Sequence, residues 1–164
     1  MKKLNTYLKV SAAVMFILVF VFGCKKTEET YSSEKEATMI KEWLDTNVIS
    51  NDIDTTSTGL YYIVGKQGTG AAVQEGDTVT VKYIGMFLNG AVFDSSSSFT
   101  YVHKATNQRM IQGWEEGIEV MNKGESADFL IPSAKAYGDN GYASIPPFTP
   151  LLFTIEIVDI KFGL

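Results

Sequence analysis

Cysteine, histidine and proline are scarce in this chain of 164 residues, which contains one Cys, one His and four Pro. A single cysteine, Cys24, cannot form a disulfide within the chain. The single histidine, His103, has no cysteine pair to complete a metal site, so we expect no metal and no cofactor, and we place His103 on the surface of a loop. The formal net charge is −5, which argues against nucleic-acid binding because that function needs basic patches.

The N-terminal segment has the pattern of an export signal. Lysines at positions 2 and 3 precede an almost wholly apolar stretch over 10–22, and Gly23-Cys24 follows. The stretch is shorter than the roughly 20 residues that a membrane-spanning helix needs, so a signal peptide over 1–23 is favoured over an uncleaved anchor. A small residue directly before a lone cysteine resembles the lipobox of bacterial lipoproteins, which implies lipidation of Cys24. We therefore expect attachment to the bacterial cell envelope, on the periplasmic side or at the outer-membrane surface.

A polar tether and a helix are predicted next. Residues 24–33 are polar and charged, as in a tether. Ser33 and Glu36 have the spacing of a capping box, and apolar residues that include Trp43 then recur at helical intervals, which predicts a helix from about 34 to 49. Three alternatives are open for its short apolar stripe: packing on the domain's own flank, pairing with a second copy in a homodimer, or a mobile arm. A polar, turn-rich linker follows, so that helix and linker together span 34–58.

From residue 59 onward the pattern is typical of an antiparallel sheet. Apolar and polar residues alternate over 78–84, 127–131 and 153–157, which predicts strands with one buried face. Asn89-Gly90 lies between apolar residues and predicts a tight hairpin turn. No internal repeat is visible, so one domain over 59–164 accounts for this part of the chain.

One helix interrupts the strands, from about 112 to 121, with Gly124 as its predicted C-cap. We expect its inner face to carry Trp114, Ile118 and Met121, and its outer face to carry Glu115, Glu116 and Glu119. An antiparallel sheet has one apolar face, and one short helix can cover it. The predicted fold class is therefore α+β.

Six short segments, in this order along about two thirds of the chain, resemble the FKBP-type peptidyl-prolyl cis-trans isomerases. They are GDTVTVKY (76–83), GAVFDSS (90–96), IQGWEEG (111–117), AYG (136–138), IPP (145–147) and LLF (151–153). The resemblance implies an antiparallel β half-barrel wrapped around one short α-helix, with the N-terminal helix outside the domain. It also implies that the protein binds proline-containing polypeptides and is inhibited by macrolides such as tacrolimus or rapamycin.

The resemblance further implies an apolar pocket for a proline ring. By this resemblance, the catalytic residues are Asp94, Tyr137 and Phe93. The substrate-binding residues are Tyr83, Phe99, Met110, Ile111, Trp114, Ile145 and Phe153. Trp114 would form the floor, and Asp94 would lie at the rim. The backbone N–H of Ile111 and the hydroxyl of Tyr137 would bind substrate carbonyls. Without the resemblance, Tyr83 and Phe153 fit a plain core, and Asp94 fits a turn.

An apolar pocket can accelerate rotation about an X-Pro bond, whose barrier is roughly 18–20 kcal/mol. Water bound to the carbonyl stabilises the planar ground state more than the twisted transition state, so withholding water lowers the barrier. Two functions remain: an isomerase that assists folding of envelope or secreted proteins, or a weakly or non-catalytic module or chaperone that binds proline segments in an envelope assembly. Non-catalytic relatives usually lose Trp114, Tyr137 or Asp94, and the presence of all three favours the enzyme.

Overall fold

The computed structural model describes residues 31–47, 53–107 and 110–163. Its elements are helix α2 (Ser33–Asn47), strands β1 (Asp54–Thr55), β2 (Tyr61–Lys66), β3 (Thr78–Phe87) and β4 (Val92–Val102), helix α3 (Gln112–Glu119), strand β5 (Ser126–Ile131), the 3-10 helix η1 (Ser133–Lys135) and strand β6 (Leu151–Lys161). The predicted signal peptide and Cys24 lie outside the described residues. Within those residues no helix is both long and apolar enough to cross a membrane.

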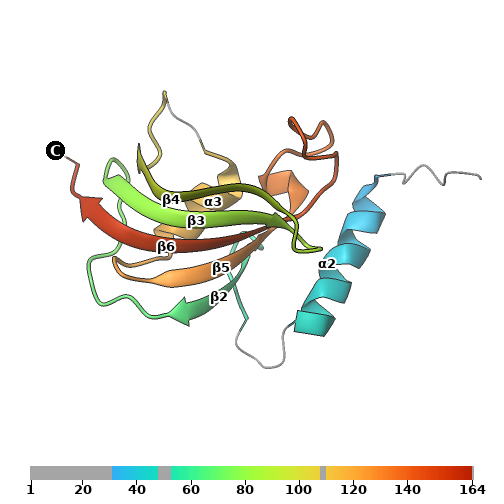
Figure 1. Ribbon diagram of the computed structural model, residues 1–164, viewed down its shortest axis with the longest axis horizontal. Helices are drawn as coiled ribbons and strands as arrows, with labels where there is room; N and C mark the ends of the chain where they lie inside the picture. The colour runs from blue at the N-terminus through green and yellow to red at the C-terminus, as the bar shows by residue number, and fades with distance from the viewer. Residues whose placement is uncertain (1–30, 48–52, 108–109, 164) are drawn as a thin grey trace, which may run out of the picture. The chain divides into compact units, whose positions relative to one another are not determined.

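One sheet of six strands, in the order β1-β2-β5-β6-β3-β4, carries the fold (Figure 1). Every neighbouring pair is antiparallel. The predicted alternation is confirmed in the central strands, where residues such as Val79 and Ile155 are fully buried. The predicted hairpin turn is confirmed as well: Gly90 has a φ of +85°, a conformation that glycine adopts readily, and the N–H of Phe87 donates to the carbonyl of Ala91.

Helix α3 lies close against the inner face of β5. A Cβ atom built on Gly113 would overlap Cγ2 of Ile131, so a larger residue there would push the helix away from the sheet. The helix is shorter than predicted, because it ends at Glu119 and Val120 is its C-cap. The predicted C-cap, Gly124, lies instead in the turn before β5, where its φ is +85°.

The outer face of α3 is less exposed than the sequence pattern predicts. The side chains of Glu115 and Glu116 are 12% and 17% exposed, whereas that of Glu119 is 38% exposed. Glu116 accepts a hydrogen bond from Thr58 at 2.6 Å and forms an ion pair with Lys135 at 2.9 Å. The prediction that all three glutamates face solvent is therefore wrong for two of them, because segments distant in sequence fold over the helix.

Two strands extend into parts of the chain for which the sequence predicts a turn at Asp94 and a linker before residue 59. Strand β4 continues through the four serines at 95–98 and pairs with β3 along its length, so Asp94 lies within a strand. The linker contains β1, whose two residues pair with Tyr62 and Tyr61. Pairing with a neighbouring strand outweighs the low intrinsic strand preference of these polar residues.

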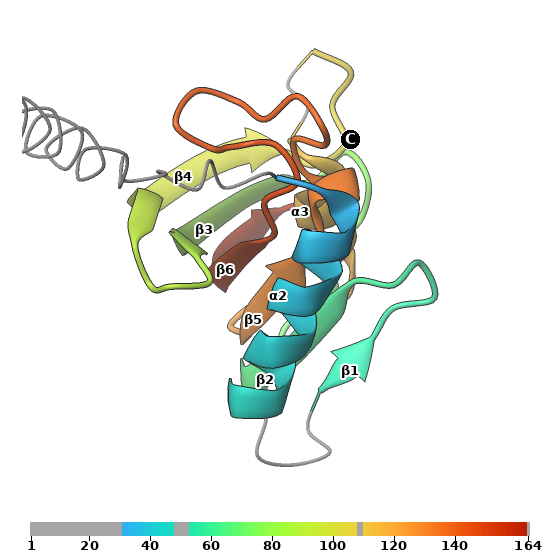
Figure 2. The same cartoon turned by 90° about the vertical axis from the view of Figure 1, so that its right-hand side faces the viewer.

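Helix α2 contacts the flank of its own domain (Figure 2). The carboxylate of Glu36, which is 8% exposed, accepts hydrogen bonds from the backbone N–H and the hydroxyl of Ser133 at 2.5 and 2.6 Å. Near the other end of the helix, Trp43 lines a narrow gap together with Leu130 and Leu152 of the sheet. These contacts favour packing on the domain over the mobile arm, and the homodimer stays a prediction. The last residues of the predicted helix lie outside the described ranges.

Candidate active site

Trp114 lies at the centre of a group of aromatic side chains from β3, β4, α3 and β6. It is 1% exposed, and its ring centroid lies 5.1 Å from that of Tyr83 and 5.5 Å from that of Phe153, at interplanar angles of 86° and 84°. Phe99 lies 6.4 Å from Trp114, and Phe93 meets Phe153 edge to face at 5.6 Å. Such edge-to-face contacts are favourable. We call Tyr83, Phe93, Phe99, Trp114 and Phe153 the aromatic cluster.

Met110, Ile111 and Ile145 extend this cluster. Ile145 is 7% exposed, and Met110 and Ile111 are partly buried against the core. Ile111 is the N-cap residue of α3 and has an extended backbone conformation, at the end of the helix where backbone N–H groups lack partners within the helix. All seven residues that were predicted to bind substrate therefore belong to one hydrophobic cluster.

Asp94 lies at the exposed edge of the aromatic cluster and is held there by Tyr83. The hydroxyl of Tyr83 donates to Oδ2 of Asp94 at 2.8 Å, and the N–H of Ser95 donates to Oδ1 at 2.9 Å. Burial and the bond to Asp94 raise the pKa of Tyr83 to about 12, so its hydroxyl remains a donor at neutral pH. The carboxylate thus has a fixed orientation. The family resemblance predicts that Asp94 lies at the rim of the site, but it does not predict the hydrogen bond from Tyr83.

Tyr137 opens the loop that follows η1, and its ring stacks on that of Tyr142 at 5.1 Å. Burial, together with repulsion from Tyr142 and Asp94, raises the pKa of Tyr137, so its hydroxyl keeps its proton at neutral pH. The loop is closed by backbone hydrogen bonds in both directions between Tyr142 and Ile145, at 2.9 and 2.8 Å. Tyr137 packs against the same hydrophobic core as Phe93 and Phe99.

Gly85 of β3 leaves space for two rings of the aromatic cluster. A Cβ atom at this position would lie 2.8 Å from Cζ of Phe93 and 2.9 Å from Cε1 of Phe153. A side chain here would displace one of the two rings or distort the strand. A glycine within a strand can mark a close approach of this kind, but only the structure shows which groups approach.

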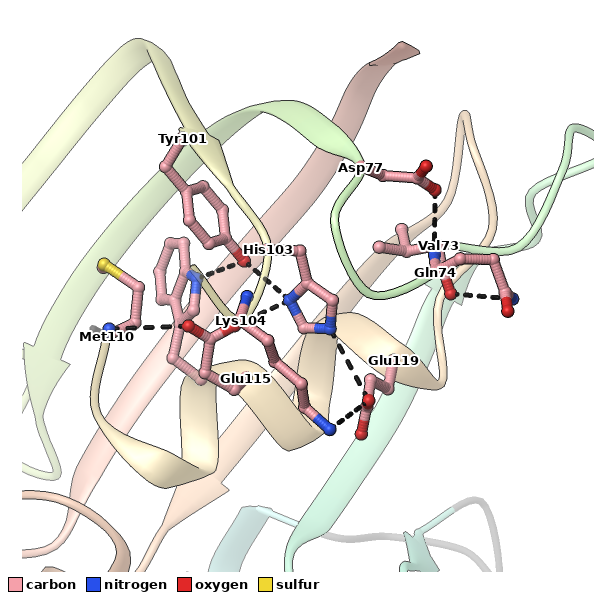
Figure 3. A network of polar contacts seen from close by, with 10 residues as sticks. Val73, Gln74, Asp77, Tyr101, His103, Lys104, Met110, Glu115 and Glu119 are labelled. Atoms are coloured by element: carbon pink, nitrogen blue, oxygen red, sulfur yellow. Dashed lines mark hydrogen bonds and ion pairs between the residues drawn. The ribbon is translucent and has the colours of Figure 1, made fainter. Parts of the chain in front are cut away.

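A buried polar network behind Trp114 was not predicted (Figure 3). The indole N–H of Trp114 donates to the hydroxyl of Tyr101 at 3.0 Å. That hydroxyl lies 3.4 Å from Nδ1 of His103, and Nδ1 lies 2.6 Å from Oε2 of Glu115. The placement of His103 on a loop surface is therefore wrong, because its side chain is 0% exposed. It contacts Glu115 and Glu119 of α3, and no local sequence pattern indicates that this helix packs beside it.

The site as a whole combines apolar rings with one carboxylate and two phenolic hydroxyls. Such a set can enclose a neutral apolar group and offer it hydrogen bonds at the edge. In the described part of the chain, no group of three or more His, Cys, Asp or Glu side chains could hold a metal ion.

Comparison with known proteins identifies the family. Residues 70–158 match the model of the FKBP-type peptidyl-prolyl cis-trans isomerases. A probable FKBP-type peptidyl-prolyl cis-trans isomerase of Haemophilus influenzae is 38% identical over 111 residues, which are 67% of this chain and 46% of the relative. FkpA of Escherichia coli K12 is 36% identical over 121 residues, which are 74% of this chain and 45% of the relative.

Solved structures agree with this result. The crystal structure of FkpA from Escherichia coli gives a TM-score of 0.70 at 28% identity, covering 96% of this chain and 68% of that one. The crystal structure of AtFKBP13 gives 0.61 at 30% identity, covering 66% and 98%. The chain belongs to the family of FKBP-type peptidyl-prolyl cis-trans isomerases, and its FKBP-like α+β fold is confirmed. It spans about half the length of the curated relatives it matches.

Proposed function

We propose that this protein is a peptidyl-prolyl cis-trans isomerase that binds a proline ring against the aromatic cluster. The observation that carries the proposal is the set of near-perpendicular rings around Trp114, with the hydrogen-bonded pair of Tyr83 and Asp94 at its exposed edge. The family to which the chain belongs supports the same activity. The clients we propose are proline-containing segments of envelope or secreted proteins.

The mechanism follows from the removal of water. In the planar ground state the imide carbonyl carries partial negative charge and binds water, and this charge is lost when the C–N bond twists. Rings that exclude water from the carbonyl therefore raise the free energy of the ground state relative to the transition state. Each reduction of the barrier by about 1.4 kcal/mol increases the rate tenfold.

The polar groups at the edge position the substrate. The hydroxyl of Tyr137 donates to one substrate carbonyl, and the backbone N–H of Ile111 donates to another. Asp94, held by Tyr83, accepts from the substrate or polarises it. Because these bonds fix the peptide while the prolyl bond stays among the rings, the protein binds the twisted form better than the planar one.

A protease-coupled assay of X-Pro isomerisation, with the chain shortened to residues 27–164, tests this function. We expect exchange that is faster than the uncatalysed reaction, which takes tens to hundreds of seconds, and inhibition by tacrolimus or rapamycin. An uncatalysed rate at micromolar concentrations of folded protein would contradict the proposal. Binding of a proline peptide without acceleration would favour the alternative, a non-catalytic binding module.

Tyr137→Phe removes one hydroxyl and little volume. If this hydroxyl binds substrate, kcat/KM should fall several-fold, since one hydrogen bond contributes about 0.5–1.5 kcal/mol, while the melting temperature should remain unchanged. Thermal unfolding and kcat/KM measured on the same preparation check this. The matched control is Tyr62→Phe, at a ring that stacks on Phe129 and is not part of the aromatic cluster. Equal activity in the two variants would show that Tyr137 does not act on substrate.

We further propose that Cys24 carries a lipid anchor that holds the domain in the cell envelope. The support comes from the sequence: an apolar stretch over 10–22, a small residue before the cysteine, and a polar stretch after it. One acyl chain of myristoyl size binds a membrane only marginally, so stable attachment needs more than one chain.

Cys24→Ser is therefore expected to release the domain from the membrane fraction or to leave an unprocessed precursor. Fractionation of cells that express the variant and the wild-type protein, followed by mass measurement, checks this result. Lys25→Ser, which keeps the cysteine, serves as the control and should fractionate like the wild type. Normal processing and unchanged membrane association of Cys24→Ser would show that the cysteine is not the anchor.

A further inference from the structure

Resting on the proposed function, we propose that His103 is a positioning residue for the isomerase reaction. Held by Glu115, it acts through Tyr101 to fix the orientation of Trp114, which lies at the centre of the aromatic cluster. The inference rests on the buried polar network of Figure 3. This network joins Trp114 to the charged groups around His103.

The first step concerns the charges around His103. Its Nδ1 lies 2.6 Å from Oε2 of Glu115, and its Nε2 lies 3.6 Å from Oε1 of Glu119. Lys104 also forms an ion pair with Glu119, and Glu75 adds a further negative charge near Lys104. The imidazole thus lies between two carboxylates of α3, and the short contact requires Nδ1 to donate to Glu115.

The second step concerns Tyr101. Its hydroxyl accepts the indole N–H of Trp114 at 3.0 Å, and burial, with the charge of Glu115 next, raises its pKa far above the ordinary value. The hydroxyl therefore keeps its proton, and it lies 3.4 Å from Nδ1 of His103, which in turn donates to the carboxylate of Glu115 at 2.6 Å. A chain of contacts therefore leads from Glu115 through His103 and Tyr101 to the ring of Trp114.

The third step concerns the wall of the site. The backbone N–H of Met110 donates to Oε1 of Glu115 at 3.5 Å, and that of Lys104 donates to Oε2 at 3.4 Å. The carboxylate that contacts His103 therefore also holds the segment that brings Met110 against the core. A change at His103 should therefore alter the position of Trp114, at the centre of the aromatic cluster, and that of Met110 beside it.

The fourth step separates this role from a purely stabilising one. His103 Nε2 has no hydrogen-bond partner, alone among the buried side-chain nitrogen and oxygen atoms of the described residues. A buried polar atom without a hydrogen bond costs stability. A leucine of similar size would not incur that cost. The presence of histidine is better explained by the donor that it supplies to Glu115.

The first experiment measures the orientation of Trp114 independently of enzymatic activity. The indole N–H resonances of the full chain in detergent micelles are compared among the wild type, His103→Leu, which cannot donate, and His103→Gln, which can. We expect the Trp114 resonance to move clearly in His103→Leu and less in His103→Gln. The other tryptophan, Trp43, should not move in either. Glu125→Gln, a change at a buried carboxylate outside this network, should leave Trp114 in place.

The second experiment uses a double-mutant cycle on kcat/KM. His103→Leu and Tyr101→Phe should each lower it about two- to tenfold, the range expected for one hydrogen bond. The double variant should be no worse than the poorer single variant, because both changes break one path. Additive losses, or an unmoved Trp114 resonance in His103→Leu, would overturn the proposal. An inactive wild type would instead contradict the proposed function, and the resonances alone would then decide whether His103 positions Trp114.

Discussion

Phe93→Ala is expected to lower kcat/KM at least tenfold, which corresponds to about 1.4 kcal/mol of barrier. Phe93 packs edge to face on Phe153 at 5.6 Å and lies 5.2 Å from Phe87. Its removal opens this side of the aromatic cluster to water, so the substrate carbonyl regains its hydration. Because the ring is only partly buried, the loss of stability should stay below the roughly 3–5 kcal/mol of a fully buried phenylalanine.

The measurement pairs kcat/KM with thermal unfolding and includes Tyr62→Ala as a matched control. Tyr62 is also a partly buried ring that packs on a phenylalanine, Phe129, at 5.9 Å, so its truncation costs comparable packing outside the aromatic cluster. We expect similar losses of melting temperature in the two variants and a large loss of activity only in Phe93→Ala. If activity per folded molecule fell equally in both, Phe93 would be part of the scaffold and not of the site.

Trp114→Ala is expected to have the largest effect on stability. The side chain is 1% exposed and contacts the rings of Tyr83, Phe99 and Phe153. Its truncation should cost about 3–5 kcal/mol and lower the melting temperature by roughly 10 °C or more. Activity should fall below detection, because the centre of the aromatic cluster is removed.

Trp114→Phe separates the two contributions of this residue. Phenylalanine keeps an aromatic ring but cannot donate to Tyr101, so we expect a smaller loss of stability and partial activity. Calorimetric unfolding and kcat/KM, measured on the same samples of both variants, check that Trp114→Phe loses less stability and less activity than Trp114→Ala. A loss of less than about 1 kcal/mol in Trp114→Ala would contradict a central, closely packed tryptophan.

The parts of the fold that depend on local patterns could be predicted from the sequence. Asn89-Gly90 specifies a tight turn by backbone conformation alone, and the alternation around Val81 or Phe129 specifies which face of a strand is buried. Helix α3 was predicted for the same reason, since Trp114 and Ile118 lie one turn apart. Its end was predicted less well, because end positions depend on capping contacts as much as on periodicity.

The buried polar network could not be predicted, because the contacts that close it join the end of β4 to α3, and no local pattern specifies how these two segments meet. His103 follows a strand that is rich in polar residues and reads as a loop residue, yet its side chain is fully buried and contacts Glu115 and Glu119 of α3. Glu115 lies on the polar face of an amphipathic pattern and is nevertheless turned against His103. Similarly, Glu36 gives no sign in the sequence that it binds Ser133, which lies 97 positions away.

The most direct test of the central claim is to observe the reaction and the aromatic cluster in one sample. Two-dimensional NMR exchange spectroscopy reports cis–trans exchange of an X-Pro peptide while the indole resonances report its binding place. We predict accelerated exchange together with a shift of the Trp114 resonance and none of Trp43 when the peptide is added. In a sample already saturated with tacrolimus, the same peptide should neither exchange faster nor change the Trp114 resonance further. Accelerated exchange with an unmoved Trp114 resonance would contradict the claim that the aromatic cluster is the active site.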